Sequence, residues 1–331
     1  MKSGLDTNGL EGRAGTQAPE GSQAGGRKGT DRPVALVTGA SSGIGLVTAR
    51  ALARAGYSVA CVSRGEGVGA EVVERLRAET GSTGLHFLPA DLARPREAVA
   101  VADAFRERFG RLDALVNNAG AFVSKRVVTD DGLELTFALN HLSTFALTLA
   151  LLPELRQAGG RVVTVSSDAA LGARLQLDDP TSDRRFSGWS AYAWSKLCNQ
   201  LFTAELARRL EGSGVSANAV HPGFVATSFG HVGGVVGGAM GLMQRLFGRS
   251  PERGADTVVW LASSPEVDGR TGGYYVDRRE RPFAPRARDV EAQRRLWTLS
   301  EAMLERIGVQ VQWDDGQTRV RSASHRAAAA P

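Results

Sequence analysis

Tyr192 and Lys196 are the two residues of this sequence whose types and spacing most directly suggest chemistry. Residues four apart share one face of a helix, so the ammonium of Lys196 can lie beside the phenol of Tyr192. A neighbouring cation favours the phenolate, and we expect it to lower the pKa of Tyr192 from its ordinary value of about 10. Tyr192 would then be a usable proton donor or acceptor. The alternative for such a pair is a plain surface contact on a helix.

A glycine-rich turn lies between an apolar run at Val34–Thr38 and an amphipathic run that begins at Ile44. Its glycines permit a tight turn and a close approach of backbone N–H groups to a pyrophosphate, and the N-terminus of the following helix favours the anion. The spacing is GxxxGxG, which differs from the better-known GxGxxG. Such a turn can be an ordinary glycine-rich loop without a ligand, but its place between the first strand and the first helix predicts a dinucleotide site. The residues assigned to that site are Gly39, Ser41, Ser42, Gly43, Ile44 and Gly45.

Arg64 follows the second apolar run, at the place where an NAD enzyme typically carries an acidic residue for the ribose 2′-hydroxyl. Glu66 lies two residues further on, beyond Gly65. A planar guanidinium that is always charged can clamp a 2′-phosphate. The position therefore favours NADP(H) over NAD(H), with an ordinary surface arginine as the alternative.

Short apolar runs alternate with longer segments of helical period, and these elements must position the motifs. The expected strands are Val34–Thr38, Ser58–Ser63, Leu85–Pro89, Leu112–Val116, Arg161–Ser166, Val215–His221 and Tyr274–Val276. The expected helices are Ile44–Ala55, Gly69–Glu79, Pro95–Phe109, Asp131–Leu152, Ser187–Leu210, Pro251–Ala262 and Val290–Ile307.

This alternation predicts an α/β fold, a doubly wound parallel sheet of the Rossmann type, with about seven strands and helices on both faces. Parallel neighbours require crossover connections, and both faces of the sheet must then be covered. Ligands of such sheets bind beyond the carboxyl ends of the strands, where the motifs fall. We expect a single domain over residues 32–308, between flexible tails at 1–31 and 309–331, which hold little large apolar side chain.

Composition narrows the functional classes. The chain has 331 residues, 42% of them hydrophobic, and a formal charge of +5 in which arginines are interspersed with acidic residues. This favours a solvated mixed surface, so no nucleic-acid partner is expected. Cys61 and Cys198 have no metal-ligand spacing, so no metal site is expected. Without a long apolar run or a signal peptide, we expect a cytoplasmic protein with no membrane span.

The chain resembles the short-chain dehydrogenase/reductase family over about residues 32–308. The motifs that carry the resemblance occur in the family's order along the chain. They are TGASSGIG at 38–45, Asp91-Leu92, Asn117-Asn118-Ala119-Gly120, Asn140, Ser166-Ser167, Tyr192-x-x-x-Lys196 and Pro222-Gly223.

The resemblance implies four catalytic residues. Ser167 would hydrogen-bond the substrate oxygen, Tyr192 would exchange its proton, and Lys196 would also hold the nicotinamide ribose. Asn140 would support Lys196 through a bound water. Ser166 is an alternative to Ser167 as the catalytic hydroxyl.

The resemblance also implies further cofactor contacts, each with a plainer alternative. Asp91 with Leu92 would meet the adenine, although Asp91 could instead cap a helix. Asn117 and Ala119 would line the cofactor cleft, although Asn117 could instead tie loops together. Val225 and Thr227 would touch the nicotinamide carboxamide.

Within the family, the sequence most resembles the retinol dehydrogenase-like branch. The segments concerned are Asp131–Leu142, Ser195–Asn199 and Arg295–Trp297, together with the spacing of 25 between the serine and the tyrosine. Animal relatives often carry an N-terminal membrane anchor, where this sequence has a polar tail. Because of this difference, the resemblance decides neither membrane attachment nor whether the substrate is a retinoid. Homodimers and homotetramers are both compatible with the sequence.

The expected reaction is hydride transfer between a nicotinamide and a carbonyl carbon, with a proton supplied to the substrate oxygen. Residues 228–248 are glycine-rich but contain valine, methionine, leucine and phenylalanine, which suits a lid over a lipophilic aldehyde, ketone or alcohol. A plain loop that packs its own apolar residues is the alternative. A second class of function is a dinucleotide-binding sensor or scaffold without turnover, against which the intact catalytic residues argue.

Overall fold

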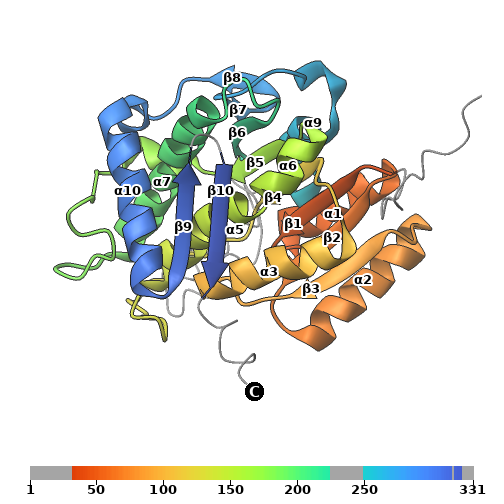
Figure 1. Cartoon of the computed structure of the whole chain (residues 1–331), viewed down its shortest axis with the longest axis horizontal. Coiled ribbons are helices and arrows are strands. Elements are labelled where there is room, and N and C mark those ends of the chain that lie inside the picture. The colour runs from red at the N-terminus through yellow and green to blue at the C-terminus, as the bar shows by residue number, and fades with distance from the viewer. Residues whose placement is uncertain (1–31, 224–248, 315–316, 323–331) are drawn as a thin grey trace, which may run out of the picture.

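The short apolar runs form one eight-stranded sheet in the computed structural model, which describes residues 32–223, 249–314 and 317–322 (Figure 1). Seven strands are parallel and β8 is antiparallel to β7, in the order β3-β2-β1-β4-β5-β6-β7-β8. The bounds are β1 Val34–Thr38, β2 Ser58–Ser63, β3 Leu85–Pro89, β4 Ala114–Asn117, β5 Arg161–Val165, β6 Ser216–His221, β7 Tyr274–Val276 and β8 Arg279–Arg281. The prediction of a doubly wound parallel sheet is confirmed, with one strand more than expected.

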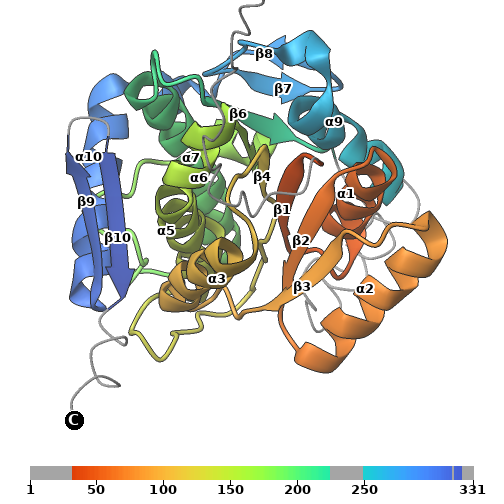
Figure 2. The same ribbon diagram turned by 45° about the vertical axis from the view of Figure 1, so that its right-hand side comes forward.

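Helices cover both faces of the sheet (Figure 2). One face carries α1 (Gly43–Arg54), α2 (Glu66–Thr80) and α9 (Pro251–Ser263). The other carries α3 (Pro95–Arg108), α5 (Ser143–Ala150) and α7 (Gly188–Arg209), with α10 (Val290–Arg306) packed on α7. This arrangement follows from the crossover connections that parallel strands require.

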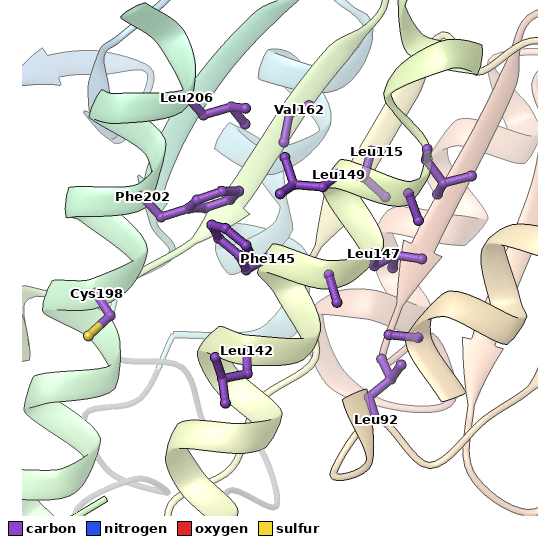
Figure 3. Close-up of a cluster of buried hydrophobic side chains, with 14 of the residues drawn as sticks. Leu92, Leu115, Leu142, Phe145, Leu147, Leu149, Val162, Cys198, Phe202 and Leu206 are labelled. Carbon is purple, nitrogen blue, oxygen red and sulfur yellow. The ribbon is translucent and has the colours of Figure 1, made fainter. Parts of the chain in front are cut away.

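Alternate residues of the central strands enter the two cores. In β1, Val34 and Leu36 belong to the core under α3, α5 and α7, whereas Ala35 and Val37 belong to the core under α1, α2 and α9. Figure 3 shows the first core, where Phe145 of α5 meets Phe202 of α7 with ring centroids 5.4 Å apart. Burial on both faces explains why central strands such as β1 and β2 are almost continuously apolar.

The strand order reverses between β1 and β4, which lie side by side although other strands separate them in sequence. Connections from β1 lead one way along the sheet, and connections from β4 lead the other way. Such a switch point leaves a crevice beyond the carboxyl ends of the two strands. The glycine turn after β1 and the loop after β4 therefore meet there.

The expected continuous helix over Asp131–Leu152 is wrong. This region contains α4 (Leu135–Phe137), a π-helical turn at Ala138–Leu142, α5, and then α6 (Leu152–Ala158). Pro153 in the first turn of α6 explains the break after α5, because proline lacks the N–H needed to continue the preceding helix. A hydropathy pattern does not distinguish a π-turn from an α-turn.

The sequence pattern does not predict three of the strands. The turn before β8 places Asp277 and Arg278 at positive φ (51° and 58°), without the glycine or asparagine that normally announces such a turn. Strands β9 (Val309–Asp314) and β10 (Gln317–Ser322) form an antiparallel hairpin within the segment expected to be a flexible tail. Residues 1–31 and the expected lid at 228–248 lie outside the described residues.

The hairpin is held by aromatic and cationic contacts. Trp313 of β9 meets Trp297 of α10 edge-on at 5.4 Å, and the guanidinium of Arg209 lies 4.1 Å from the centroid of the Trp297 ring and 5.6 Å from that of the Trp313 ring. A cation over an indole face is favourable, most of all when it is shielded from water. These contacts extend the folded domain past residue 308.

Among the described residues no single helix has the length and apolar character to span a membrane. One bent pair, Leu135–Ala150 with Leu152–Ala158 at 57°, meets those two criteria together.

Candidate active site

The glycine turn makes a close helix-to-strand contact. Gly39 and Gly43 have φ of +66° and +54°, which favour glycine. A Cβ added to Gly45 would lie 2.2 Å from Gly39 O and 2.5 Å from Asn118 Nδ2, so only glycine fits there. The side chain of Ser42, at the N-cap of α1, makes no capping bond, and the first turn has no acidic residue. This helix N-terminus therefore has donors for an anion, as a dinucleotide phosphate requires.

Thr38 ties this turn to the loop after β4. Its hydroxyl donates to Val116 O at 3.3 Å and accepts from the backbone N–H groups of Asn118 (2.9 Å) and Ala119 (3.0 Å). In return, Asn118 Nδ2 donates to Thr38 O at 2.8 Å. These reciprocal bonds fix the two walls of the crevice relative to each other. Neither Thr38 nor Asn118 was assigned to the site from sequence, although both lie inside the quoted motifs.

Arg64 lies just past β2 and before α2. Its side chain is exposed and has no hydrogen-bond or ion-pair partner within the described part of the chain. A free guanidinium at this edge is able to receive a phosphate without breaking another contact.

Of the other predicted cofactor residues, three are buried or hydrogen-bonded within the protein and two lie outside the described residues. Asp91 Oδ1 accepts from Ala93 N at 3.1 Å in a local turn, and Leu92 is buried. Asn117 is also buried, and its Nδ2 donates to Thr148 Oγ1 of α5 at 2.9 Å, which ties β4 to that helix. Val225 and Thr227 lie outside the described residues.

The predicted catalytic side chains converge at the carboxyl end of β5. A hydrogen bond from the Ser167 hydroxyl reaches the phenol of Tyr192 on α7. Lys196, one helical turn further along α7, is buried, and its Nζ lies 5.7 Å from the centroid of the Tyr192 ring. Lys196 Nζ donates to Val165 O at 3.0 Å, and Asn199 Nδ2 donates to the same oxygen at 3.2 Å.

The two neighbouring serines have separate roles. Ser166 is buried, and its hydroxyl donates to Lys196 O at 2.8 Å, which joins β5 to α7. Ser167 is partly exposed and accepts from Ala169 N at 3.2 Å, while its own hydroxyl faces Tyr192. The geometry therefore favours Ser167 over Ser166 as the hydroxyl that meets a substrate.

The pKa shifts differ from the sequence expectation. Burial raises the pKa of Tyr192 to about 12, and the Ser167 hydrogen bond opposes that rise. Burial lowers the pKa of Lys196 to about 8. The expectation that Lys196 lowers the pKa of Tyr192 was wrong, because desolvation of the buried phenol is the largest influence and the Ser167 hydrogen bond is the influence that opposes it. Tyr192 is therefore a protonated donor at neutral pH.

Asn140 lies in the π-turn and has its amide committed to the site's scaffold. Its Nδ2 donates to Ala121 O (3.0 Å) and to Ser195 Oγ (2.9 Å), and its Oδ1 accepts from Ala121 N (2.8 Å). A Cβ added to Gly120 would lie 3.1 Å from Asn140 Oδ1 and 3.4 Å from Lys196 Nζ. The absence of a side chain at this glycine thus leaves the amide and the ammonium close together.

His141, the next residue in the π-turn, also points into the protein. It is fully buried, and its Nε2 lies 2.9 Å from Ser300 Oγ on α10. Burial lowers the pKa of His141 to about 3, so the imidazole is neutral at physiological pH. It connects the turn that carries Asn140 to α10.

Comparisons with known proteins agree with this geometry. A family model described as short chain dehydrogenase matches residues 33–232. Retinol dehydrogenase 14 of Homo sapiens is 39% identical over 286 residues, which cover 81% of this chain and 85% of the relative. Polyprenol dehydrogenase of Mus musculus is 42% identical over 272 residues, covering 80% and 81%. The structure of L-sorbose reductase from Gluconobacter frateurii complexed with NADPH and L-sorbose matches with a TM-score of 0.61 and 25% identity, covering 75% and 95%.

We expect Gly45→Ala to weaken dinucleotide binding and to lower the free energy of unfolding by about 1–3 kcal/mol, because the new methyl group overlaps the Gly39 carbonyl. Gly67→Ala is the control, since a Cβ at this α2 position meets nothing within 4 Å. Urea unfolding and cofactor titration by fluorescence measure the two effects. Equal stability and affinity in both variants would contradict the close contact.

Proposed function

This chain belongs to the short-chain dehydrogenase/reductase family, in the branch that resembles the retinol dehydrogenases, and it is an enzyme that binds NAD(P). From this premise we propose that it interconverts a lipophilic aldehyde or ketone and the corresponding alcohol, with a preference for NADP(H) and with Tyr192 as proton donor and acceptor. The observation that carries the proposal is the hydrogen bond between Ser167 and a protonated Tyr192, on a helix that also buries Lys196.

Ser167, Tyr192 and Lys196 have separate roles in the proposed reaction. A nicotinamide, when bound, would supply a hydride to the carbonyl carbon in reduction and accept one from the alcohol carbon in oxidation. Ser167 and Tyr192 present two hydroxyl donors to the oxygen on which negative charge develops during reduction. Tyr192 transfers its proton to that oxygen, and in the oxidative direction it takes the proton from the alcohol. Lys196 supplies ammonium donors beside the phenol, in a position from which it would hold the nicotinamide ribose.

The cofactor preference rests on Arg64. Its exposed guanidinium has no partner among the described residues and follows the strand next to the glycine turn. A 2′-phosphate there would gain a charge-assisted contact that a 2′-hydroxyl would not. One solved relative, L-sorbose reductase, is a complex with NADPH.

The preference for a lipophilic substrate rests on the aromatic side chains around Tyr192. The rings of Phe122 and Trp189 lie 6.0 Å and 6.1 Å from the Tyr192 ring, and Trp189 is 60% exposed. An exposed indole beside the proposed proton donor offers apolar area to a substrate. Two relatives are named for retinol and polyprenol, which are lipophilic alcohols. The sensor or scaffold alternative is not favoured, because it would leave the convergent hydroxyls without use.

Tyr192→Phe should lower kcat for carbonyl reduction at least about 100-fold, since it removes the proton donor.

In the wild type, kcat for carbonyl reduction should stay constant from pH 6 to 8 and decline above about pH 8 as Lys196 loses its proton, because the pKa of Lys196 is about 8. Alcohol oxidation should instead rise with pH, because it needs the Tyr192 phenolate and the pKa of that phenol is about 12. Absorbance of the reduced cofactor follows both directions. Turnover that persists in Tyr192→Phe would refute the donor.

Arg64→Ala should raise the KM for NADPH about 10-fold or more, as expected for the loss of a charge-assisted contact, and should leave the KM for NADH unchanged. Arg54→Ala, an exposed arginine in the last turn of α1, is the control. Steady-state kinetics with NADPH and with NADH measure the KM for each cofactor in both variants. An equal change for both cofactors in Arg64→Ala would overturn the assigned preference.

Trp189→Ala should raise the KM for a long-chain aldehyde about 10-fold and change the KM for a three-carbon aldehyde little, because only the longer chain covers the indole. Trp189→Phe retains most of the apolar surface and is the matched variant. A panel of linear aldehydes of increasing length measures the trend. The same loss at every chain length would argue against an apolar subsite at this residue.

A further inference from the structure

Asp168, the residue that follows Ser167, joins three neighbouring strands at the edge of the site. Its Oδ1 accepts from the hydroxyl of Tyr274 on β7 at 2.7 Å, and its Oδ2 lies 3.5 Å from His221 Nε2 at the end of β6. The sheet order β5-β6-β7 places these strands side by side. The turn that carries Ser167 is therefore attached, through the next side chain, to the two strands beyond β5.

Tyr274 reaches this carboxylate from the interior. Its side chain is buried, and its ring stacks on Phe283 at 6.0 Å. Its neighbour Tyr275 belongs to the core on the opposite face, where its ring meets Trp260 at 5.8 Å. Of these two adjacent tyrosines, only Tyr274 is hydrogen-bonded to Asp168, the residue next to Ser167.

His221 adds a second group to the same carboxylate. Burial, the largest influence, lowers the pKa of His221, so the imidazole is neutral at physiological pH. Its Nδ1 is buried and has no hydrogen-bond partner within residues 32–223 and the other described segments. Beside it, Arg249 pairs with Asp277. Asp168 therefore faces the hydroxyl of Tyr274 and the neutral ring of His221.

The fold does not depend on this connection. Half of the Asp168 side chain is exposed, at 50%, so water can solvate the carboxylate if the tyrosine hydroxyl is removed. Strand β7 is already paired with β6, and Ser167 already accepts from Ala169 N. The bond from Tyr274 adds a restraint on where the turn after β5 lies, and that turn holds the hydroxyl which meets Tyr192.

We propose that Asp168, held by Tyr274 and His221, is a positioning residue that fixes the Ser167 hydroxyl against Tyr192. The inference rests on the roles proposed above for Ser167 and Tyr192. Catalytic donors must be held to within a fraction of an ångström, and supporting hydrogen bonds from neighbouring elements provide that precision. A displacement of about 1 Å lowers turnover by up to about 100-fold.

The test is a double-mutant cycle on the full chain, with NADPH and an aldehyde that the wild type reduces. Tyr274→Phe should lower kcat about 10- to 100-fold and leave the KM for NADPH and the melting temperature at wild-type values. Tyr275→Phe is the matched control and should keep full activity. In a Ser167→Ala background, measured by single turnover, Tyr274→Phe should cause no additional loss, because its effect acts through Ser167.

Asp168→Asn and Asp168→Ala separate a restraint from a general requirement for charge. The amide oxygen of asparagine still accepts the Tyr274 hydroxyl, so Asp168→Asn should keep most of kcat, whereas Asp168→Ala should match Tyr274→Phe. Unchanged kcat in Tyr274→Phe, or a loss that adds fully to that of Ser167→Ala, would overturn the inference while the proposed reaction stands.

A wild type that reduces no aldehyde or ketone would instead overturn the proposed reaction. The restraint is then decided by crystal structures of wild type and Tyr274→Phe in the same crystal form with NADP⁺ bound. We expect the Ser167 hydroxyl to move away from Tyr192 in the variant. An unmoved serine would overturn the inference.

Discussion

The buried ammonium of Lys196 is the constraint around which the site is built. Removing a cation from water is costly unless acceptors replace the lost solvent, and here burial lowers the pKa of Lys196 to about 8. The carbonyl of Val165 meets the ammonium at 3.0 Å, and the bare backbone of Gly120 leaves room for the Asn140 amide beside it. The end of β5, the loop after β4 and the π-turn are therefore all placed to accommodate one side chain of α7.

Much of the fold could be predicted because burial on both faces makes each strand an apolar run, and the helices between them carry a clear 3.6-residue period. Strands β1 and β2, which are buried throughout, have the expected bounds for this reason. The π-turn at Ala138–Leu142 could not be predicted, since its apolar pattern is also that of an α-helix. The hairpin β9–β10 depends on Trp313 meeting Trp297 and Arg209, which are distant in sequence.

The site was predictable where a motif places its chemistry within a few residues, as in the glycine turn and the Tyr192–Lys196 pair. It was not predictable where the outcome depends on burial. The pKa of Tyr192 is raised because the phenol is desolvated, and the spacing of residues along the chain carries no information about desolvation. Similarly, Thr38 and Tyr274 act through strands that become neighbours only in the folded sheet.

The π-turn has a consequence for how the molecule comes apart. Two consecutive side chains of this turn, Asn140 and His141, are buried, and the second is bonded to Ser300 of α10. Detaching that helix would strip a buried imidazole of its partner within the segment that supports the ammonium. The carboxyl-terminal helix and the catalytic centre should consequently open together in native-state hydrogen exchange, as one cooperative unit rather than as a fraying end.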